Sequence, residues 1–239
     1  MLRLITYTTP SHAEMCKRFV LDRASGFGDV ICGEYPQTCK SGRFKQPGWN
    51  ACMDDKLHAL LRLPTDGVRT VYADSDVILL DGFADFVADK FDNMKTNEIA
   101  FADDIVQWCC GVMLFRSTKR LRKFFKAVAY VSKMFAAPDQ DIIHFFRQNS
   151  PKFPLPVSML DRDKVCNWAT VSSVDTAEAK ATFGVEVLKH GCLWEGQQIV
   201  APDQMVAYHA NFCVGVEAKM QMLSQIEEIE RQRLASKPL

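Results

Sequence analysis

The chain has 239 residues, 48% of them hydrophobic and 24% charged, which suffices for the core of one large α/β domain. Lys+Arg and Asp+Glu both number 29, which excludes the strongly basic balance typical of proteins that collect nucleic acid. No apolar run approaches the roughly 20 residues that span a bilayer, and the N-terminus lacks a charged-then-apolar signal pattern. We therefore expect a cytoplasmic protein with no transmembrane segment and no nucleic-acid partner.

The first predicted elements are a strand, a helix and a second strand. Residues 2–7 form an apolar, β-rich run that ends before Pro10, which lacks a backbone donor. Ser11 stands three residues before Glu14, which is the spacing of a capping box, and an apolar helical pattern follows. Residues 29–32 fit a short second strand.

The next predicted elements are a loop, a helix and a strand. Turn signals without periodicity fill residues 33–48, which we interpret as an exposed loop. Apolar residues then recur at helical spacing over residues 49–63, until a proline ends the helix. A strand over residues 68–73 follows and stops directly before Asp74.

Strands continue to alternate with helices up to about residue 150. Residues 98–102 and 111–115 have the pattern of strands, and residues 117–135 and 139–148 have the pattern of helices. This alternation predicts a mostly parallel sheet flanked by helices, with ligand sites beyond the carboxyl ends of the strands. Later, we expect only short strands near residues 157, 165 and 206, and a polar helix over residues 216–233.

Two further features receive a structural interpretation. A basic run at Arg120, Arg122 and Lys123 is typical of a solvated helix face rather than of a phosphate site. The cysteines form no Cys-x-x-Cys pair, so we expect reduced thiols, most of them in the core, with a zinc site or a reactive thiol as the alternative. There are nine, at positions 16, 32, 39, 52, 109, 110, 166, 192 and 213.

The segment Asp74-Ser75-Asp76 suggests a metal site. In an extended backbone, residues two apart point the same way, so the two carboxylates converge while Ser75 points to the other side. Carboxylate oxygens suit Mg²⁺ or Mn²⁺, and such an ion neutralises the charge on a departing nucleoside diphosphate. The alternative is that both aspartates only cap a turn.

Five short motifs stand in a particular order along the chain. They are Asp74-Ser75-Asp76, Glu98 to Asp104, Cys110 to Ser117, Asp139-Gln140-Asp141 and His209 to Phe212. In order and approximate spacing, they resemble the nucleotide-diphospho-sugar transferases of GT-A fold over nearly the whole chain. The resemblance implies a single GT-A-like domain over residues 1–239. Its nucleotide-binding part would be residues 1–150, and residues 151–239 would complete the metal site and bind the acceptor.

The resemblance also implies the metal and diphosphate contacts. Asp74, Asp76 and His209 would hold Mn²⁺ or Mg²⁺, with His209 adding an imidazole nitrogen. Gly215 and Lys219 would wrap the donor diphosphate, because glycine permits close backbone approach and lysine pairs with phosphate. Without the resemblance, His209 reads as an ordinary half-buried histidine, and Lys219 as a solvated helix lysine.

Nucleotide contacts are implied near the amino terminus and at the aspartate motif. Thr8 and Thr9, at the end of the first strand, would hold the base and ribose. Lys56 would point toward the donor, although a solvated lysine is the ordinary alternative on such a helix. Asp74 and Ser75 complete the implied donor contacts.

Catalytic contacts are implied at the sugar. Asp103 would contact the donor sugar, and Asp139 with Gln140 would lie beside the anomeric carbon. Asp139 also has the sequence context of a helix N-cap, which does not exclude catalysis. Retaining relatives often carry asparagine just before Gly111, where this chain has two cysteines, so the identity of the donor sugar stays open.

The implied reaction is transfer of a hexosyl or pentosyl group to a hydroxyl of a glycan or protein acceptor. A UDP-sugar donor is favoured, with a GDP-sugar possible, and similarity to retaining enzymes favours retention. The acceptor would enter over the Asp139 side.

Three other functions are alternatives to sugar transfer. A haloacid-dehalogenase-type phosphohydrolase would use Asp74 as nucleophile and Asp76 as acid/base, but about 27 residues between Asp76 and Asp103 leave too little chain for its other elements. A nucleotidyltransferase needs a glycine-rich loop after the first strand, which is missing. A non-catalytic module that binds nucleotide sugars stays open.

Overall fold

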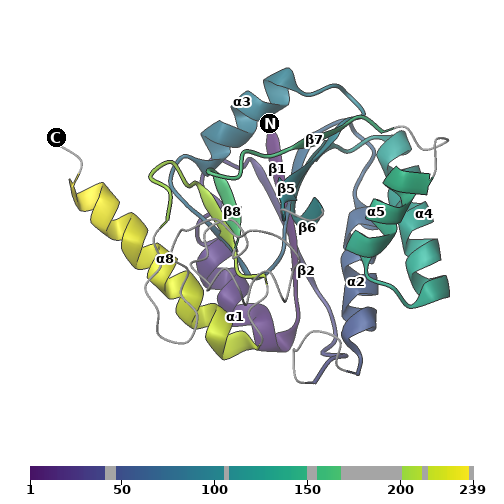
Figure 1. The fold of residues 1–239 in the computed structure, drawn as a ribbon, viewed down its shortest axis with the longest axis horizontal. Coiled ribbons are helices and arrows are strands. Elements are labelled where there is room, and N and C mark those ends of the chain that lie inside the picture. The colour runs from purple at the N-terminus through teal and green to yellow at the C-terminus, as the bar shows by residue number, and fades with distance from the viewer. Residues whose placement is uncertain (41–46, 105–107, 150–154, 168–200, 212–214, 237–239) are drawn as a thin grey trace, which may run out of the picture.

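A six-stranded sheet forms the centre of the protein in a computed structural model that describes residues 1–40, 47–104, 108–149, 155–167, 201–211 and 215–236 (Figure 1). Its strands are β1 (Leu2–Thr8), β2 (Asp29–Glu34), β3 (Arg69–Ala73), β5 (Ile99–Asp103), β6 (Trp108–Arg116) and β7 (Val157–Met159). They lie in the order β2-β1-β3-β6-β5-β7, and every pairing is parallel except where β6 runs antiparallel to both neighbours. The predicted mostly parallel sheet is therefore confirmed.

Helices cover both faces of this sheet. The described helices are η1 (Pro10–His12), α1 (Ala13–Cys16), the π-helical turn η2 (Lys17–Leu21), α2 (Trp49–Arg62), α3 (Phe83–Asn93), α4 (Lys119–Phe135), α5 (Asp139–Asn149) and α8 (Val216–Ser236), of which α8 packs on a second sheet. Helices α2, α4 and α5 lie on one side of the sheet, and α1 and α3 lie on the other (Figure 1). Successive residues of a strand face opposite sides, so Ile5 and Tyr72 pack with α2, α4 and α5, whereas Leu4 and Val71 pack with α1, η2 and α3. This layering matches the predicted fold class.

A second, three-stranded sheet connects the early and late parts of the chain. Its strands are β4 (Val77–Leu79), β8 (Val165–Asn167) and β9 (Ala207–His209). β9 lies between the other two, antiparallel to β4 and parallel to β8. The pairing sets Val77 opposite His209, and Ala210 N donates a hydrogen bond of 2.9 Å to Asp76 O. Residues more than 130 positions apart therefore become immediate neighbours.

The last helix, α8, packs on this second sheet. Its buried residues Met222, Leu223 and Ile226 share a core with Ile78 of β4 and Tyr208 of β9. No helix in the described ranges is long and apolar enough to cross a membrane.

Two details differ from the sequence prediction. The capping box is wrong, because the helix begins one turn early as η1, and the Ser11 hydroxyl lies 2.8 Å from His12 Nδ1 instead of capping. α3 is not among the predicted elements, although Phe83, Val87 and Phe91 recur every four residues and are all buried. Helical spacing alone could have revealed it.

Candidate active site

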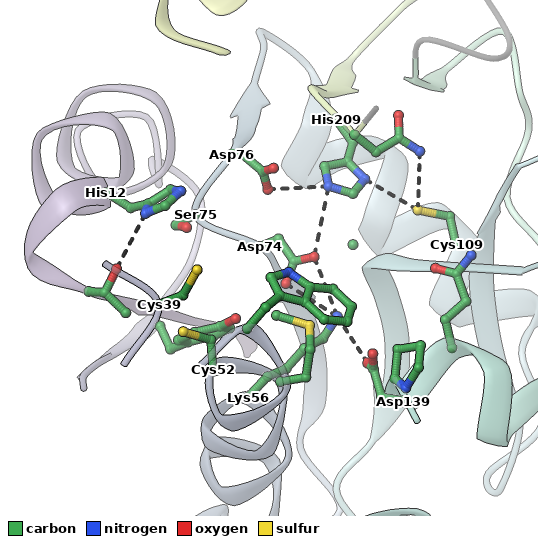
Figure 2. Close-up of a pocket in the computed structure, with 18 of the residues that line it drawn as sticks. His12, Cys39, Cys52, Lys56, Asp74, Ser75, Asp76, Cys109, Asp139 and His209 are labelled. Carbon is green, nitrogen blue, oxygen red and sulfur yellow. Dashed lines mark hydrogen bonds and ion pairs between the residues drawn. The ribbon is translucent and has the colours of Figure 1, made fainter. Parts of the chain in front are cut away.

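A cavity of about 490 Å³ opens at the edge of the main sheet where β1, β3 and β5 end (Figure 2). Its lining comes from elements far apart in the sequence, because parallel strands deliver their following residues to one edge. The lining includes Thr9, Trp49, Lys56, Asp74, Ser75, Asp76, Asp104, Cys109, Gly111, Asp139, Gln140, His209, Asn211 and Lys219. This is the edge predicted for a ligand site.

Asp74 and Asp76 lie in a tight turn between β3 and β4. Val77 N donates to Asp74 O over 3.2 Å, and Asp74 N donates to Gly111 O over 2.8 Å. Because the backbone turns here, the expected extended geometry is wrong, and Ser75 lines the same cavity as the two aspartates (Figure 2).

His209, the last residue of β9, completes a cluster with both aspartates. Its Nε2 lies 3.2 Å from Asp76 Oδ1 and 3.8 Å from Asp74 Oδ2 (Figure 2). One donor atom from each of the three side chains lies within 4.8 Å of the others. His209 is buried, so it is not the half-exposed loop histidine of the alternative interpretation.

The His209 ring is held from two sides. Its Nδ1 lies 3.2 Å from the Cys109 sulfur. On another side it packs against the backbone of Gly111, where an added Cβ would overlap the ring. Burial alone would lower the pKa of His209, but Cys109 and Asp76 raise it well above its ordinary value. Cys109 is a buried free thiol, as expected for most of the cysteines, and it also lines the cavity, which the sequence did not indicate.

Lys219 and Lys56 balance the negative charge of the aspartates. Lys219, from the first turns of α8, forms an ion pair with Asp76 Oδ2. Burial opposes ionisation of Asp76, but Lys219 and His209 outweigh it and lower its pKa well below the ordinary value. The cluster is thus stabilised by compensating charge in the protein itself.

Lys56 bridges two carboxylates across the cavity floor. Its ammonium lies 3.3 Å from Asp74 Oδ1 and 3.1 Å from Asp139 Oδ2, and donates to Cys110 O over 2.9 Å (Figure 2). Only 2% of Lys56 is exposed, so it is not a solvated helix lysine. Burial alone would lower its pKa, but Asp139 and Asp74 raise it well above the ordinary value. The Tyr72 hydroxyl adds a hydrogen bond of 2.5 Å to Asp74.

Asp139 is the first residue of α5, rather than its N-cap, and is buried. Its neighbour Gln140 joins α5 to the end of β5, because the Gln140 amide donates to Asp104 Oδ2 over 3.3 Å. Asn211 donates to the other oxygen of Asp104 over 3.1 Å. Burial of Asp104 raises its pKa to about 6.

Asp103 and Asp104 differ in their surroundings. Asp103, the predicted sugar contact, forms an ion pair with Arg162, and its backbone oxygen accepts a hydrogen bond from Asn167. Asp104 lines the cavity instead. Sequence reasoning singled out the first aspartate and missed the second, although the two are adjacent.

The remaining predicted residues lie around the site. Thr9 lines the cavity beside His12, with 3.3 Å between Thr9 Oγ1 and His12 Nδ1. Thr8 is buried, and its hydroxyl donates to the backbone oxygen of Thr9. Gly215 has φ +97°, a conformation that favours glycine, and precedes α8 directly.

The cysteines that the structure describes fit the predicted thiols. Seven are free, and all of them except Cys32 are buried. Cys192 and Cys213 lie outside the described residues.

Comparison with known proteins identifies the family. The sequence model of the nucleotide-diphospho-sugar transferases matches residues 28–223, which is well over half of the chain. No functionally curated protein matches the sequence.

Solved structures of glycosyltransferases share the fold. A glycosyltransferase involved in glycosylation of the major capsid of PBCV-1 superposes with a TM-score of 0.57 at 14% identity, covering 92% of this chain and 98% of that one. Mouse xyloside xylosyltransferase 1 gives 0.54 at 10% identity, covering 88% and 98%. The galactosyltransferase LgtC, in complex with donor and acceptor sugar analogs, gives 0.53 at 11% identity, covering 97% and 99%. The chain therefore belongs to the nucleotide-diphospho-sugar transferases and is a glycosyltransferase of GT-A fold.

Proposed function

We propose that this glycosyltransferase moves a sugar from a nucleoside-diphosphate sugar to an acceptor hydroxyl with the help of Mn²⁺ or Mg²⁺ bound at Asp74, Asp76 and His209. The observation that carries the proposal is the convergence of these three side chains, within 4.8 Å, in the cavity at the sheet edge. Two carboxylates and one imidazole suit a hard or borderline divalent cation, and the imidazole favours Mn²⁺ over Mg²⁺.

The surroundings of His209 fit a metal ligand. A ligating imidazole usually has its second nitrogen fixed by another group, and here Cys109 contacts Nδ1 while Nε2 faces the aspartates. The missing side chain at Gly111 leaves space for the ring. A divalent cation bound here would neutralise the negative charge that develops on the departing diphosphate.

We assign the diphosphate to the side of the cavity formed by α8. Lys219 already pairs with a carboxylate there, and its ammonium would pair equally with phosphate oxygens. Gly215, with no Cβ and an open surrounding, would let the backbone approach the donor closely.

The sugar is assigned to the opposite wall. Asp139 and Gln140 would lie beside the anomeric carbon, with Lys56 holding the Asp139 carboxylate in place. Asp103 was the expected sugar contact, but its pairing with Arg162 favours Asp104 as the carboxylate that meets a sugar hydroxyl. The acceptor would then enter over Asp139.

We propose the donor and the stereochemistry from the family resemblance. Thr8 and Thr9 end the strand beside which these folds hold the base and ribose, and we favour a UDP-sugar over a GDP-sugar. The named activities of the similar structures include galactosyl and xylosyl transfer, so hexoses and pentoses both stand as donor sugars. Retention of the anomeric configuration follows the resemblance to retaining enzymes.

The division of labour along the chain is also a proposal. Residues 1–150 would bind the nucleotide, and residues 151–239 would complete the metal site and meet a glycan or protein acceptor, since His209 and Lys219 come from this part. Free thiols throughout the described residues favour a reducing compartment such as the cytoplasm.

A thermal-shift experiment tests the proposal. UDP, GDP and their sugars are added with and without Mn²⁺ to the native chain, to Asp76→Asn and to Asp85→Asn, a control on α3 outside the cavity. A ligand at 100 times its Kd stabilises by about 2.7 kcal/mol, or roughly 5–10 °C for a chain of this size. We expect a Mn²⁺-dependent shift with one nucleotide, which Asp85→Asn keeps and Asp76→Asn loses.

Transfer activity gives a second readout. Hydrolysis or transfer of the identified nucleotide sugar should disappear when a chelator removes the cation. Full activity in chelator would refute the metal assignment. A nucleotide-dependent thermal shift without transfer or hydrolysis would favour a module that binds nucleotide sugars and has lost the reaction, and absence of any such shift would refute the proposed donor.

A further inference from the structure

The outer face of α4 combines dense positive charge with exposed apolar side chains. The helix carries six lysines and arginines and no acidic residue, within a chain whose formal net charge is zero. Its inner face is buried in the main core and includes Leu121, Phe124, Phe125 and Val128. The outer face contributes none of the buried residues of α4.

The exposed residues of α4 form one continuous stripe. Lys119, Lys123, Lys126, Tyr130 and Met134 are all exposed and follow one another at intervals of four, three, four and four residues. Such intervals keep side chains on a single side of a helix. Lys133 extends the stripe by a further exposed cation.

Apolar side chains concentrate at the carboxyl end of the stripe. Tyr130 is 68% exposed, Met134 55% and Phe135 69%. These are three of eight large hydrophobic residues that are exposed in the described ranges, and all three fall in the last six residues of one helix. On the neighbouring helix α5, Phe145 is 52% exposed. Single exposed apolar residues are ordinary, but a group beside lysines indicates a contact surface.

This end of α4 is tied to the rim of the cavity. The helix ends at Phe135, and Pro138, three residues later, lines the cavity together with Asp139. The Asn50 amide donates to Ala136 O over 2.8 Å, and its neighbour Trp49 also lines the cavity. Whatever binds the stripe therefore lies close to the side where Asp139 meets the acceptor in the proposed function.

We propose that the outer face of α4 docks on an anionic lipid surface, with its lysines against the headgroups and with Tyr130, Met134 and Phe135 in the interfacial layer. Charge complementarity favours a lipid surface because the stripe is uniformly cationic. A dissolved polyanion would pair with the lysines but would leave the apolar side chains at the end of the stripe in water. A lipid surface accommodates both, because aromatic side chains prefer the boundary between headgroups and acyl chains. Because the inner face of α4 belongs to the core, the helix would lie on the surface and not insert.

The proposal does not depend on sugar transfer, since docking is measured without donor or acceptor. Each lysine or arginine near an anionic surface contributes about 1 kcal/mol, which is roughly a fivefold change in partitioning. Reversing two lysines should therefore weaken binding by at least about 25-fold. Raising the salt concentration should weaken it as well, because the Debye length falls from about 10 Å at 0.1 M to about 3 Å at 1 M.

Vesicle co-sedimentation of the full chain tests the docking. Phosphatidylcholine vesicles with and without phosphatidylglycerol are mixed with the native chain, with Lys123→Glu/Lys126→Glu, and with Lys17→Glu/Arg231→Glu. The last variant makes the same change in net charge at exposed positions away from α4. We expect the native chain and this control to bind only the anionic vesicles, and the α4 variant to lose most of the binding. An unchanged midpoint of urea unfolding without ligand would show that the α4 variant is folded.

A second variant examines the apolar end. Tyr130→Ser/Met134→Ser/Phe135→Ser keeps every charge, and we expect it to bind several-fold more weakly than the native chain. Equal binding of this variant would leave only polyanion attraction and overturn the interfacial part of the proposal. Failure of the native chain to bind anionic vesicles would overturn it altogether. A concentration-dependent dimer that the same variant abolishes, without vesicle binding, would instead assign the face to a second copy of the chain.

Discussion

Asp104 provides a test of the cavity's electrostatics that needs no ligand. Its side chain is 2% exposed and accepts hydrogen bonds from Gln140 and Asn211, and its burial raises the pKa from 3.8 to about 6. Asp104→Asn keeps the size of the side chain and removes its proton equilibrium. The variant should therefore respond to pH differently from the native chain, even if both have similar stability at one pH.

The sign follows from proton binding. Between the two pKa values the folded state keeps a proton that the unfolded chain has released, so the free energy of unfolding falls as pH rises. Its contribution is full below about pH 3.8, where both states are protonated, and is lost as pH passes through about 6. From about pH 5 to about pH 7.5 the loss amounts to roughly 1.4 kcal/mol. The Asp104→Asn variant does not show this fall in the free energy of unfolding, because asparagine does not titrate.

Urea unfolding in chelator at the two pH values measures the effect. The stability of Asp104→Asn relative to the native chain should increase by roughly 1.4 kcal/mol between about pH 5 and about pH 7.5. All other titrating groups are common to both chains, so their contributions cancel in the difference. A pH-independent difference between the two pH values would contradict the reasoning, because it would mean that the pKa of Asp104 is not raised, whether the carboxylate is hydrated like a surface group or is stabilised by positive charge.

Three further substitutions test the buried contacts. Gly111→Ala should destabilise the fold by about 1–3 kcal/mol in urea unfolding and abolish the Mn²⁺-dependent thermal shift, because the added methyl overlaps His209. Lys56→Met should cost about 3–5 kcal/mol in the same assay, because it leaves the buried Asp139 carboxylate without its cation. Cys109→Ala should weaken Mn²⁺ binding by about 10–100-fold in a direct titration, because His209 loses the group that fixes its ring. Unchanged values in these measurements would contradict each argument.

The architecture was largely predictable because its signals are local. Alternating strands and helices in the first 150 residues indicated the mostly parallel sheet, and a strand that stops directly before Asp74 placed that residue at the ligand edge. The segment after Asp74 could not be judged in the same way. Asp74 and Asp76 could belong to an extended strand or to a turn. Which of the two forms depends on the pairing of β4 with β9, which involves residues far away in the sequence.

The choice between Asp103 and Asp104 shows a second limit. The pairing of β5 with β6 shifts register between Phe101 and Ala102. Side chains of β5 still alternate between the two cores across this shift, so the shift does not decide which aspartate lines the cavity. The partners decide it, because Asp103 pairs with Arg162 whereas Asp104 accepts hydrogen bonds from Gln140 and Asn211, and these partners are far away in the sequence.

Cys109 was missed for a different reason. Buried free thiols are usually core residues, and six of the described cysteines are indeed buried. Its contact with His209 depends on β6 passing beneath the end of β9, where Gly111 leaves room for the ring. The positions of Cys109 and His209 in the sequence, 100 residues apart, give no indication that the two side chains are in contact.

The two cavity lysines have different roles, although both pair with aspartates. Lys56 is almost fully buried and holds Asp74, Asp139 and a backbone oxygen at once, so its movement would uncover two carboxylates in the floor of the site. Lys219 meets Asp76 from the start of α8, and its side chain is 16% exposed. If a divalent cation took Asp76 as a ligand, as proposed, the carboxylate would no longer need the lysine, and the ammonium would become available to the anionic part of a donor. Lys56 is therefore a fixed positive charge that holds Asp74 and Asp139 in place. Lys219 is the positive charge that would become free to pair with the diphosphate once a cation is bound.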